Sequence, residues 1–73
     1  MKRLRELETE YVRLTLLEEE GVGFYVREKG LGYTNDHDTM KKYQTRNEAN
    51  AEINRIEDLI RGSGYRIICD TQY

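Results

Sequence analysis

The chain has no proline, no tryptophan and a single cysteine, Cys69, among its 73 residues. One cysteine cannot form an internal disulfide, which excludes a disulfide-stapled secreted scaffold. Because two isoleucines precede it, Cys69 is predicted to be a small buried hydrophobe rather than a reactive thiol. Apolar runs are far shorter than the roughly 20 residues that a membrane helix requires, and no signal-peptide core is evident. We therefore expect a cytoplasmic protein without membrane association.

Groups that could carry out catalysis are equally scarce. His37 is the only histidine and Ser63 the only serine, so the sequence offers no obvious pair of nucleophile and base. His37 lies between two aspartates in a predicted polar loop over residues 29–39, but this loop lacks the ligand order of a calcium site. A zinc site would need more histidines or cysteines. We expect no enzymatic activity, no metal and no cofactor.

Length and composition predict one small folded domain. A chain of 73 residues buries only about 60% of the surface that its unfolded form exposes, so its core is thin. Disorder is the alternative for a chain with 36% charged residues, but the net charge is only −2 and the apolar residues cluster periodically. The small core favours stabilisation by a partner or by a second copy of the chain. The slightly acidic balance disfavours a dedicated nucleic-acid binder.

Every local signal in residues 46–61 predicts a helix. Thr45 and Glu48 have the spacing of a capping box, in which the threonine hydroxyl accepts a bond from the backbone N–H three residues later. Apolar residues then recur at steps of three and four, as one face of a helix requires. They are Ala49, Ile53, Ile56 and Ile60. Gly62 and Gly64 follow, and glycine readily adopts the left-handed conformation that ends many helices.

Alternation of apolar and polar residues predicts strands over residues 10–18 and 24–27. Between them, two glycines and three glutamates in residues 18–23 predict a hairpin turn. A third strand is predicted over residues 40–44, and a last strand over residues 65–70, where β-branched residues are frequent.

The first residues are compatible with two structures. Apolar residues fall at steps of three and four from Leu4 to Leu14, as in a helix, whereas strict alternation from Val12 to Leu16 is typical of a strand. No helix cap precedes the alternating stretch. We therefore favour a strand from about residue 10 and expect residues 1–9 to be helical or frayed.

Together these elements predict an α+β fold with two layers, in which a mainly antiparallel sheet with β-β-β-α-β order packs one face against one helix. The other face of such a sheet is open to water. The predicted inner sheet residues are Val12, Leu14, Leu16, Phe24, Val26, Ile67 and Cys69. The predicted open-face residues are Tyr11, Arg13, Thr15, Tyr25, Arg27, Arg66 and Asp70.

Three arginines and two tyrosines against one aspartate would make that open face basic and aromatic. Tyrosine and arginine are enriched at binding hot spots, because they offer a large contact area with directed hydrogen bonds. We therefore predict a binding site formed by Tyr11, Arg13, Tyr25, Arg27 and Arg66. Ordinary cross-strand pairing on a solvated sheet is the alternative interpretation of the same residues.

Two classes of partner suit such a site. A host or viral protein would offer carboxylates to the arginines, whereas a nucleic acid or nucleotide would offer phosphates and bases that stack on the tyrosines. Very short, proline-free, charge-rich single domains resemble accessory proteins of phages and mobile elements that bind and block a host factor. This resemblance implies an inhibitor of the anti-defence type that acts by stoichiometric binding. A protein-binding module is the favoured prediction, and a nucleic-acid or nucleotide binder is the alternative.

Overall fold

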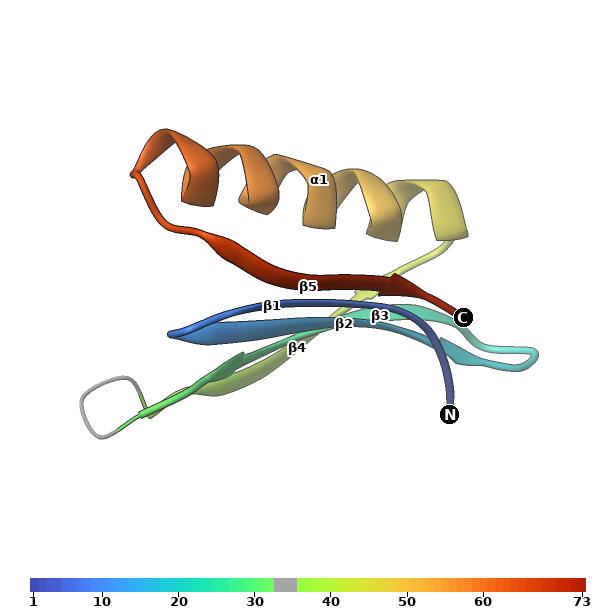
Figure 1. The fold of residues 1–73 in the computed structure, drawn as a ribbon. Helices are drawn as coiled ribbons and strands as arrows, with labels where there is room; N and C mark the ends of the chain where they lie inside the picture. Colours follow the sequence, from blue (N-terminus) through green and yellow to red (C-terminus); the bar gives the residue numbers. More distant parts are fainter. Residues whose placement is uncertain (33–35) are drawn as a thin grey trace.

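Five strands form one sheet and a single helix packs across one of its faces (Figure 1), in a computed structural model that describes residues 1–32 and 36–73. In chain order the elements are β1 (Lys2–Thr9), β2 (Val12–Glu19), β3 (Gly23–Gly30), β4 (Asp38–Tyr43), α1 (Arg46–Gly62) and β5 (Ile67–Gln72). The strand order is β4-β3-β2-β1-β5, and all neighbouring strands are antiparallel. The predicted α+β fold with two layers is confirmed.

The prediction that residues 1–9 are helical or frayed is wrong, because β1 occupies the sheet between β2 and β5. The pairing of β1 with β2 shifts between Arg3 and Arg5, so Leu4 is the extra residue of a β-bulge. Leu4 and Arg5 are consecutive and would lie on opposite faces of a regular strand, yet both are buried, with exposed fractions of 3% and 5%. The bulge therefore places Leu4 and Leu7 on the same face at a spacing of three, which imitates a helix in the sequence.

The other elements are present with shifted ends. β2 begins two residues later than predicted, β3 extends to Gly30, and β4 begins at Asp38, so the predicted loop over residues 29–39 is shorter. Residues 33–35 of that loop lie outside the described residues. The last strand is shifted toward the C-terminus, and α1 ends one residue later than predicted. At the start of α1, Thr45 Oγ1 accepts a hydrogen bond from the Glu48 N–H at 3.1 Å, as expected for the capping box.

The core between α1 and the sheet contains most of the predicted residues, with Leu4 and Leu7 of β1 added to it. Its buried members are Leu4, Leu7, Leu14, Leu16, Val26, Ala49 and Ile53. Six partly buried residues pack against them: Val12, Phe24, Tyr43, Ile56, Ile60 and Ile67. Cys69 is absent from this set, which contradicts its predicted burial.

A second bulge explains the misplacement of Cys69 and of Asp70. The pairing of β1 with β5 shifts between Glu8 and Thr9, which leaves Ile68 as an extra residue in β5. Side chains beyond the bulge therefore change faces. Cys69 pairs with Glu8 on the side away from α1, whereas Asp70, which was predicted for the open face, points toward α1.

Asp70 belongs to a cluster around the buried Arg5 guanidinium. Arg5 Nε and Nη2 donate to the two Asp70 carboxylate oxygens at 3.0 and 2.9 Å. Nη1 donates to the Asn50 and Asn54 side chains, both at 2.8 Å, and Nη2 donates to Glu57 at 3.3 Å. This cluster ties together β1, β5 and α1. Within the described residues no buried side-chain nitrogen or oxygen lacks a hydrogen-bond partner.

Candidate binding site

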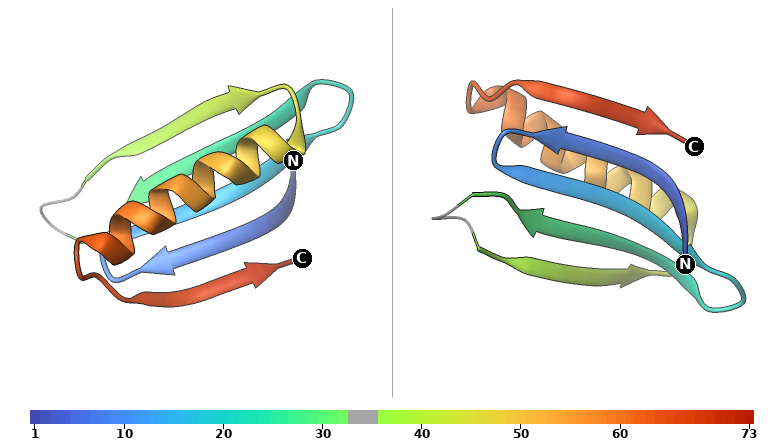
Figure 2. Two further views of the ribbon diagram at one scale, coloured as in Figure 1. Left: turned by 90° about the horizontal axis from the view of Figure 1, so that it is seen from above. Right: turned by 60° about the horizontal axis from the view of Figure 1, so that its bottom comes forward.

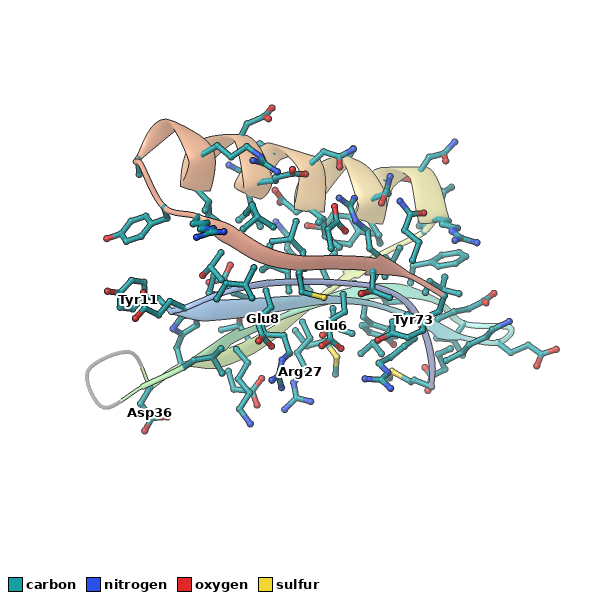
Figure 3. The ribbon with its side chains drawn as sticks, viewed as in Figure 1. Glu6, Glu8, Tyr11, Arg27, Asp36 and Tyr73 are labelled. Atoms are coloured by element: carbon teal, nitrogen blue, oxygen red, sulfur yellow. The ribbon has the colours of Figure 1, made fainter. Side chains whose placement is uncertain are left out.

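The sheet face opposite α1 (Figure 2, right) is called the open face from here on. Strands β1 to β4 contribute mainly charged side chains to it. Cross-strand pairing places its residues in rows across the sheet. Its members are Arg3, Glu6, Glu8, Arg13, Thr15, Leu17, Glu19, Tyr25, Arg27, Lys29, Asp38, Met40 and Lys42. Figure 3 shows Glu6, Glu8 and Arg27 on this side of the sheet. Arg13, Tyr25 and Arg27 therefore lie where the sequence predicted.

Acidic side chains neutralise the arginines of the open face. Arg13 Nε donates to Glu8 at 2.7 Å and lies 3.6 Å from Glu6. Arg27 makes a bidentate pair with Asp38, with Nε–Oδ1 and Nη2–Oδ2 distances of 2.9 and 2.6 Å. The hydrogen bond from Arg27 holds the pKa of Asp38 below its ordinary value.

Two acidic residues of this face, Glu6 and Glu8, come from β1. Because residues 1–9 were not predicted to form a strand, their carboxylates were missing from the predicted face. The Tyr25 hydroxyl is also engaged, since it donates to Glu19 at 3.1 Å. The open face is thus a mixed surface of ion pairs and not the basic patch that the sequence predicted.

Tyr11 and Arg66, the other two predicted site residues, are not on the open face. Tyr11 lies in the turn between β1 and β2, and Arg66 precedes β5. Figure 3 shows Tyr11 at the end of the sheet. The prediction extended the side-chain alternation of β2 back to Tyr11 and that of β5 back to Arg66. It fails because Tyr11 and Arg66 lie outside these strands, and because a bulge interrupts β5.

Tyr11 and Arg66 instead share a hollow of about 420 Å³ at this end of the molecule. We call it the tyrosine hollow, and its lining residues are Thr9, Glu10, Tyr11, Tyr65, Arg66, Ile67 and Ile68. The rings of Tyr11 and Tyr65 meet edge to face, with their centroids 5.3 Å apart. Tyr11, Tyr65 and Ile68 are 48%, 52% and 61% exposed, so this end presents a large apolar and aromatic surface to solvent.

The Tyr11–Tyr65 pair also borders a second hollow on the helix side of the sheet. This hollow has a volume of about 320 Å³ and is mainly apolar. Its lining residues are Thr9, Tyr11, Val12, Glu28, His37, Ile56, Ile60 and Tyr65. The two tyrosines therefore form a ridge between two concave surfaces.

A local turn motif positions Tyr11. The side chain of Thr9, which is 3% exposed, folds over the turn, and its Oγ1 accepts hydrogen bonds from the N–H groups of Tyr11 and Val12, both at 3.1 Å. The Tyr11 carbonyl in turn accepts from the Leu31 N–H at 2.8 Å. These bonds fix the backbone of Tyr11 on both sides.

The end of α1 positions Tyr65 in a comparable way. The Gly64 N–H donates to the Arg61 carbonyl at 3.1 Å, and the Tyr65 N–H donates to the Ile60 carbonyl at 3.1 Å. This pattern is a Schellman motif, which requires a left-handed residue after the helix. Gly64 has φ +86° and meets that requirement. The predicted helix-ending role of Gly64 is thus confirmed, and the same motif brings Tyr65 next to Tyr11.

Two charged groups of opposite sign line the tyrosine hollow. Six arginines of the described chain form ion pairs with carboxylates: Arg3, Arg5, Arg13, Arg27, Arg55 and Arg61. Within the described residues, no carboxylate lies within 4.0 Å of the Arg66 guanidinium. No Lys, Arg or His nitrogen lies within that distance of the Glu10 carboxylate. The guanidinium of Arg66 is therefore available for a charged group outside the chain.

The residues considered for a metal site are separated in the structure. Asp38 pairs with Arg27 on the open face, whereas His37 Nε2 lies 2.8 Å from Glu28 beside the second hollow. Across residues 1–32 and 36–73, no three His, Cys, Asp or Glu side chains are grouped so as to hold a metal ion. Nor does that part of the chain contain a helix with the length and apolarity needed to cross a membrane.

Comparison of the chain with protein families, curated proteins and solved structures finds no match.

Proposed function

We propose that this chain is a small protein-binding module that acts by stoichiometric binding through the tyrosine hollow. The observation that carries the proposal is the exposed Tyr11–Tyr65 pair beside a concave surface with an unpaired arginine. Tyrosine and arginine dominate binding hot spots, and an aromatic ridge between two hollows can receive side chains on both of its sides. The turn motif at Thr9 and the helix end at Gly64 fix the backbones of the two tyrosines, which reduces the ordering that binding would require.

The composition of the hollow favours a particular kind of partner. Ile67 and Ile68 suit an apolar side chain inserted beside the tyrosines, and Arg66 suits a carboxylate next to it. Glu10 lies in the same lining and would repel a partner that is acidic throughout. We therefore propose a protein segment with one apolar anchor and a neighbouring Asp or Glu.

Nucleic-acid binding through the open face has weaker support. A phosphate that bound Arg13 or Arg27 there would have to displace Glu8 or Asp38, and both pairs are already formed at hydrogen-bond distance. Glu10 likewise disfavours a polyanion at the tyrosine hollow. The same proposal includes three further predictions. The partner is a host or viral protein, the chain acts as an inhibitor of the anti-defence type, and it is located in the cytoplasm.

Site-specific photo-crosslinking in lysate of the native cells tests this proposal. A photoreactive phenylalanine replaces Ile68 in the hollow or, as the matched control, Met40 at the edge of the open face; these positions are 61% and 51% exposed. We expect a specific protein adduct from position 68, resistant to nuclease, and none of the same mass from position 40. Adducts only from position 40, or adducts that nuclease removes, would contradict the proposal.

A further inference from the structure

Strand β5 forms one edge of the sheet, and no described element lies beyond it (Figure 2). The Tyr73 N–H donates to the Leu4 carbonyl at 3.0 Å, so the backbone groups of Tyr73 face β1. Backbone direction alternates along an antiparallel strand. Thr71 therefore also faces β1, whereas the N–H and C=O groups of Asp70 and Gln72 point outward, away from the sheet.

The two edges of the sheet differ in how they are protected from pairing. The edge strand β4 carries Lys41 and Lys42, and lysine on an edge strand disfavours association with another strand. Over residues 69–72, β5 carries a single charge, Asp70, and the buried Arg5 neutralises it. The bulge at Ile68 interrupts the edge only before this stretch. Beyond the bulge, β5 is an unblocked edge.

We infer that β5 pairs in antiparallel fashion with β5 of a second copy of this chain, with Thr71 on the two-fold axis. In this register Asp70 lies opposite Gln72 of the other copy, and both residues have outward-facing backbone groups. Each such pair exchanges N–H···O bonds in both directions. The Thr71 residues of the two copies lie opposite each other in a non-hydrogen-bonded pair, and a threonine pair is a favourable cross-strand contact.

Two other symmetric registers are less favourable. With Asp70 on the axis, two carboxylates would lie directly opposite each other, which destabilises an antiparallel pair. With Cys69 on the axis, the bulged Ile68 would have to pair with Asp70 and could not present a regular ladder. Of these three registers, the Thr71 register is the one in which charge and backbone geometry agree.

This dimer would continue the sheet from one copy into the next, with both helices on the same side. The inference is independent of the proposed function, because the pairing uses residues 69–73 whereas Arg66 and Ile68 of the tyrosine hollow lie before that stretch. A second copy is also the partner that a chain with a thin core can use to bury more surface.

Oxidative cross-linking tests the register directly. Non-hydrogen-bonded pairs bring Cα atoms to about 4.5 Å, which suits a disulfide. In the Cys69→Ser background, Thr71→Cys should form a disulfide-linked dimer under mild oxidation. The matched control is Met40→Cys in the same background, because Thr71 and Met40 stand at opposite ends of one cross-strand row. It should remain monomeric.

Sedimentation velocity across a concentration series tests the dimer itself. Gln72→Pro removes an outward N–H and leaves the ladder with β1 intact, as proline at a solvent-facing edge position allows. We expect the wild-type chain to dimerise and Gln72→Pro to weaken dimerisation at least tenfold with unchanged circular dichroism. Thr71→Lys, which opposes two like charges on the axis, should act in the same direction and is the second variant if the proline alters folding. A wild-type monomer at every concentration, normal dimerisation of Thr71→Lys, or equal cross-linking through Met40→Cys would overturn the inference.

Discussion

Replacing Arg5 by methionine removes the guanidinium that joins β1, β5 and α1. The five hydrogen bonds of Arg5 match the five N–H donors of a guanidinium, so none of its donors is left without an acceptor. Methionine is flexible and fills irregular apolar space. The variant therefore tests the charge and the hydrogen bonds more than the packing.

The size of the effect depends on what the substitution leaves behind. Removing one partner of a fully buried ion pair costs about 3–5 kcal/mol, because the other charge stays buried and unpaired. Here the side chains of Asp70 and Glu57 are 32% and 19% exposed, so water partly solvates both carboxylates. We therefore expect a loss of about 2–3 kcal/mol in the free energy of unfolding. That is a large part of the roughly 4–11 kcal/mol typical of a chain of this length.

Urea unfolding followed by far-UV circular dichroism measures this loss. With a slope near 1 kcal/mol/M, typical of a small domain, the midpoint should fall by roughly 2–3 M. Arg61→Met is the matched control, because Arg61 also pairs with Glu57 but its side chain is 59% exposed. Exposed pairs contribute only about 0–1 kcal/mol. Equal losses in the two variants, or a midpoint for Arg5→Met within about 0.5 M of the wild type, would refute the reasoning.

The pH dependence of stability provides a second readout of the same cluster. The hydrogen bond from Arg5, together with the charge of Arg5, holds the pKa of Asp70 below its ordinary value, against the opposing effect of desolvation. A carboxylate with a lowered pKa in the folded state adds stability that is present above its unfolded pKa and is lost as pH falls through its folded pKa. Stability should therefore decline below about pH 4. Asp70→Asn should lower stability at neutral pH and reduce this acid-dependent decline.

The same unfolding assay checks three further predictions. Ile53→Ala should cost about 3 kcal/mol, because Ile53 is fully buried between α1 and the sheet; a loss typical of surface positions would mean that the core is misplaced. Gly64→Ala should cost about 1–2 kcal/mol since its φ is +86°, whereas Gly62→Ala should stabilise by about 0.5–1 kcal/mol because Gly62 is helical with open space around it. The same sign for both glycines would contradict the Schellman motif. Arg27→Glu should lower the unfolding midpoint far less than Ile53→Ala, because its pair with Asp38 is exposed; a comparable loss would show that the open-face ion pairs support the fold.

Features that depend on neighbours in sequence could be predicted, and α1 is the clearest case. Its cap at Thr45, its apolar face and its end at Gly64 are all encoded within a few residues, and the structure contains each of them. The hairpin of β2 and β3 was predictable for the same reason, since alternation on either side of a glycine-bearing turn is a local pattern.

Features that depend on pairing between distant segments could not be predicted. Bulges at Leu4 and Ile68 shift the side-chain alternation of β1 and β5, and they become visible only against the partner strand. The first bulge gave β1 a helix-like spacing, and the second exchanged the faces of Cys69 and Asp70. The open-face carboxylates of β1 were lost from the prediction with that strand. The tyrosine hollow was missed for a related reason, because its residues come from the β1–β2 turn and from the segment after α1.

Two arginine-to-glutamate variants separate the tyrosine hollow from the open face as the binding site. Arg66→Glu reverses the charge in the hollow, and Arg27→Glu makes the same change on the open face. Isothermal titration of each variant with the partner captured at position 68 gives the two dissociation constants. We predict that Arg66→Glu weakens binding more than about tenfold, since it replaces an attraction with a repulsion, while Arg27→Glu changes the Kd by less than about threefold. Normal binding by Arg66→Glu together with weakened binding by Arg27→Glu would contradict the assignment of the site to the hollow.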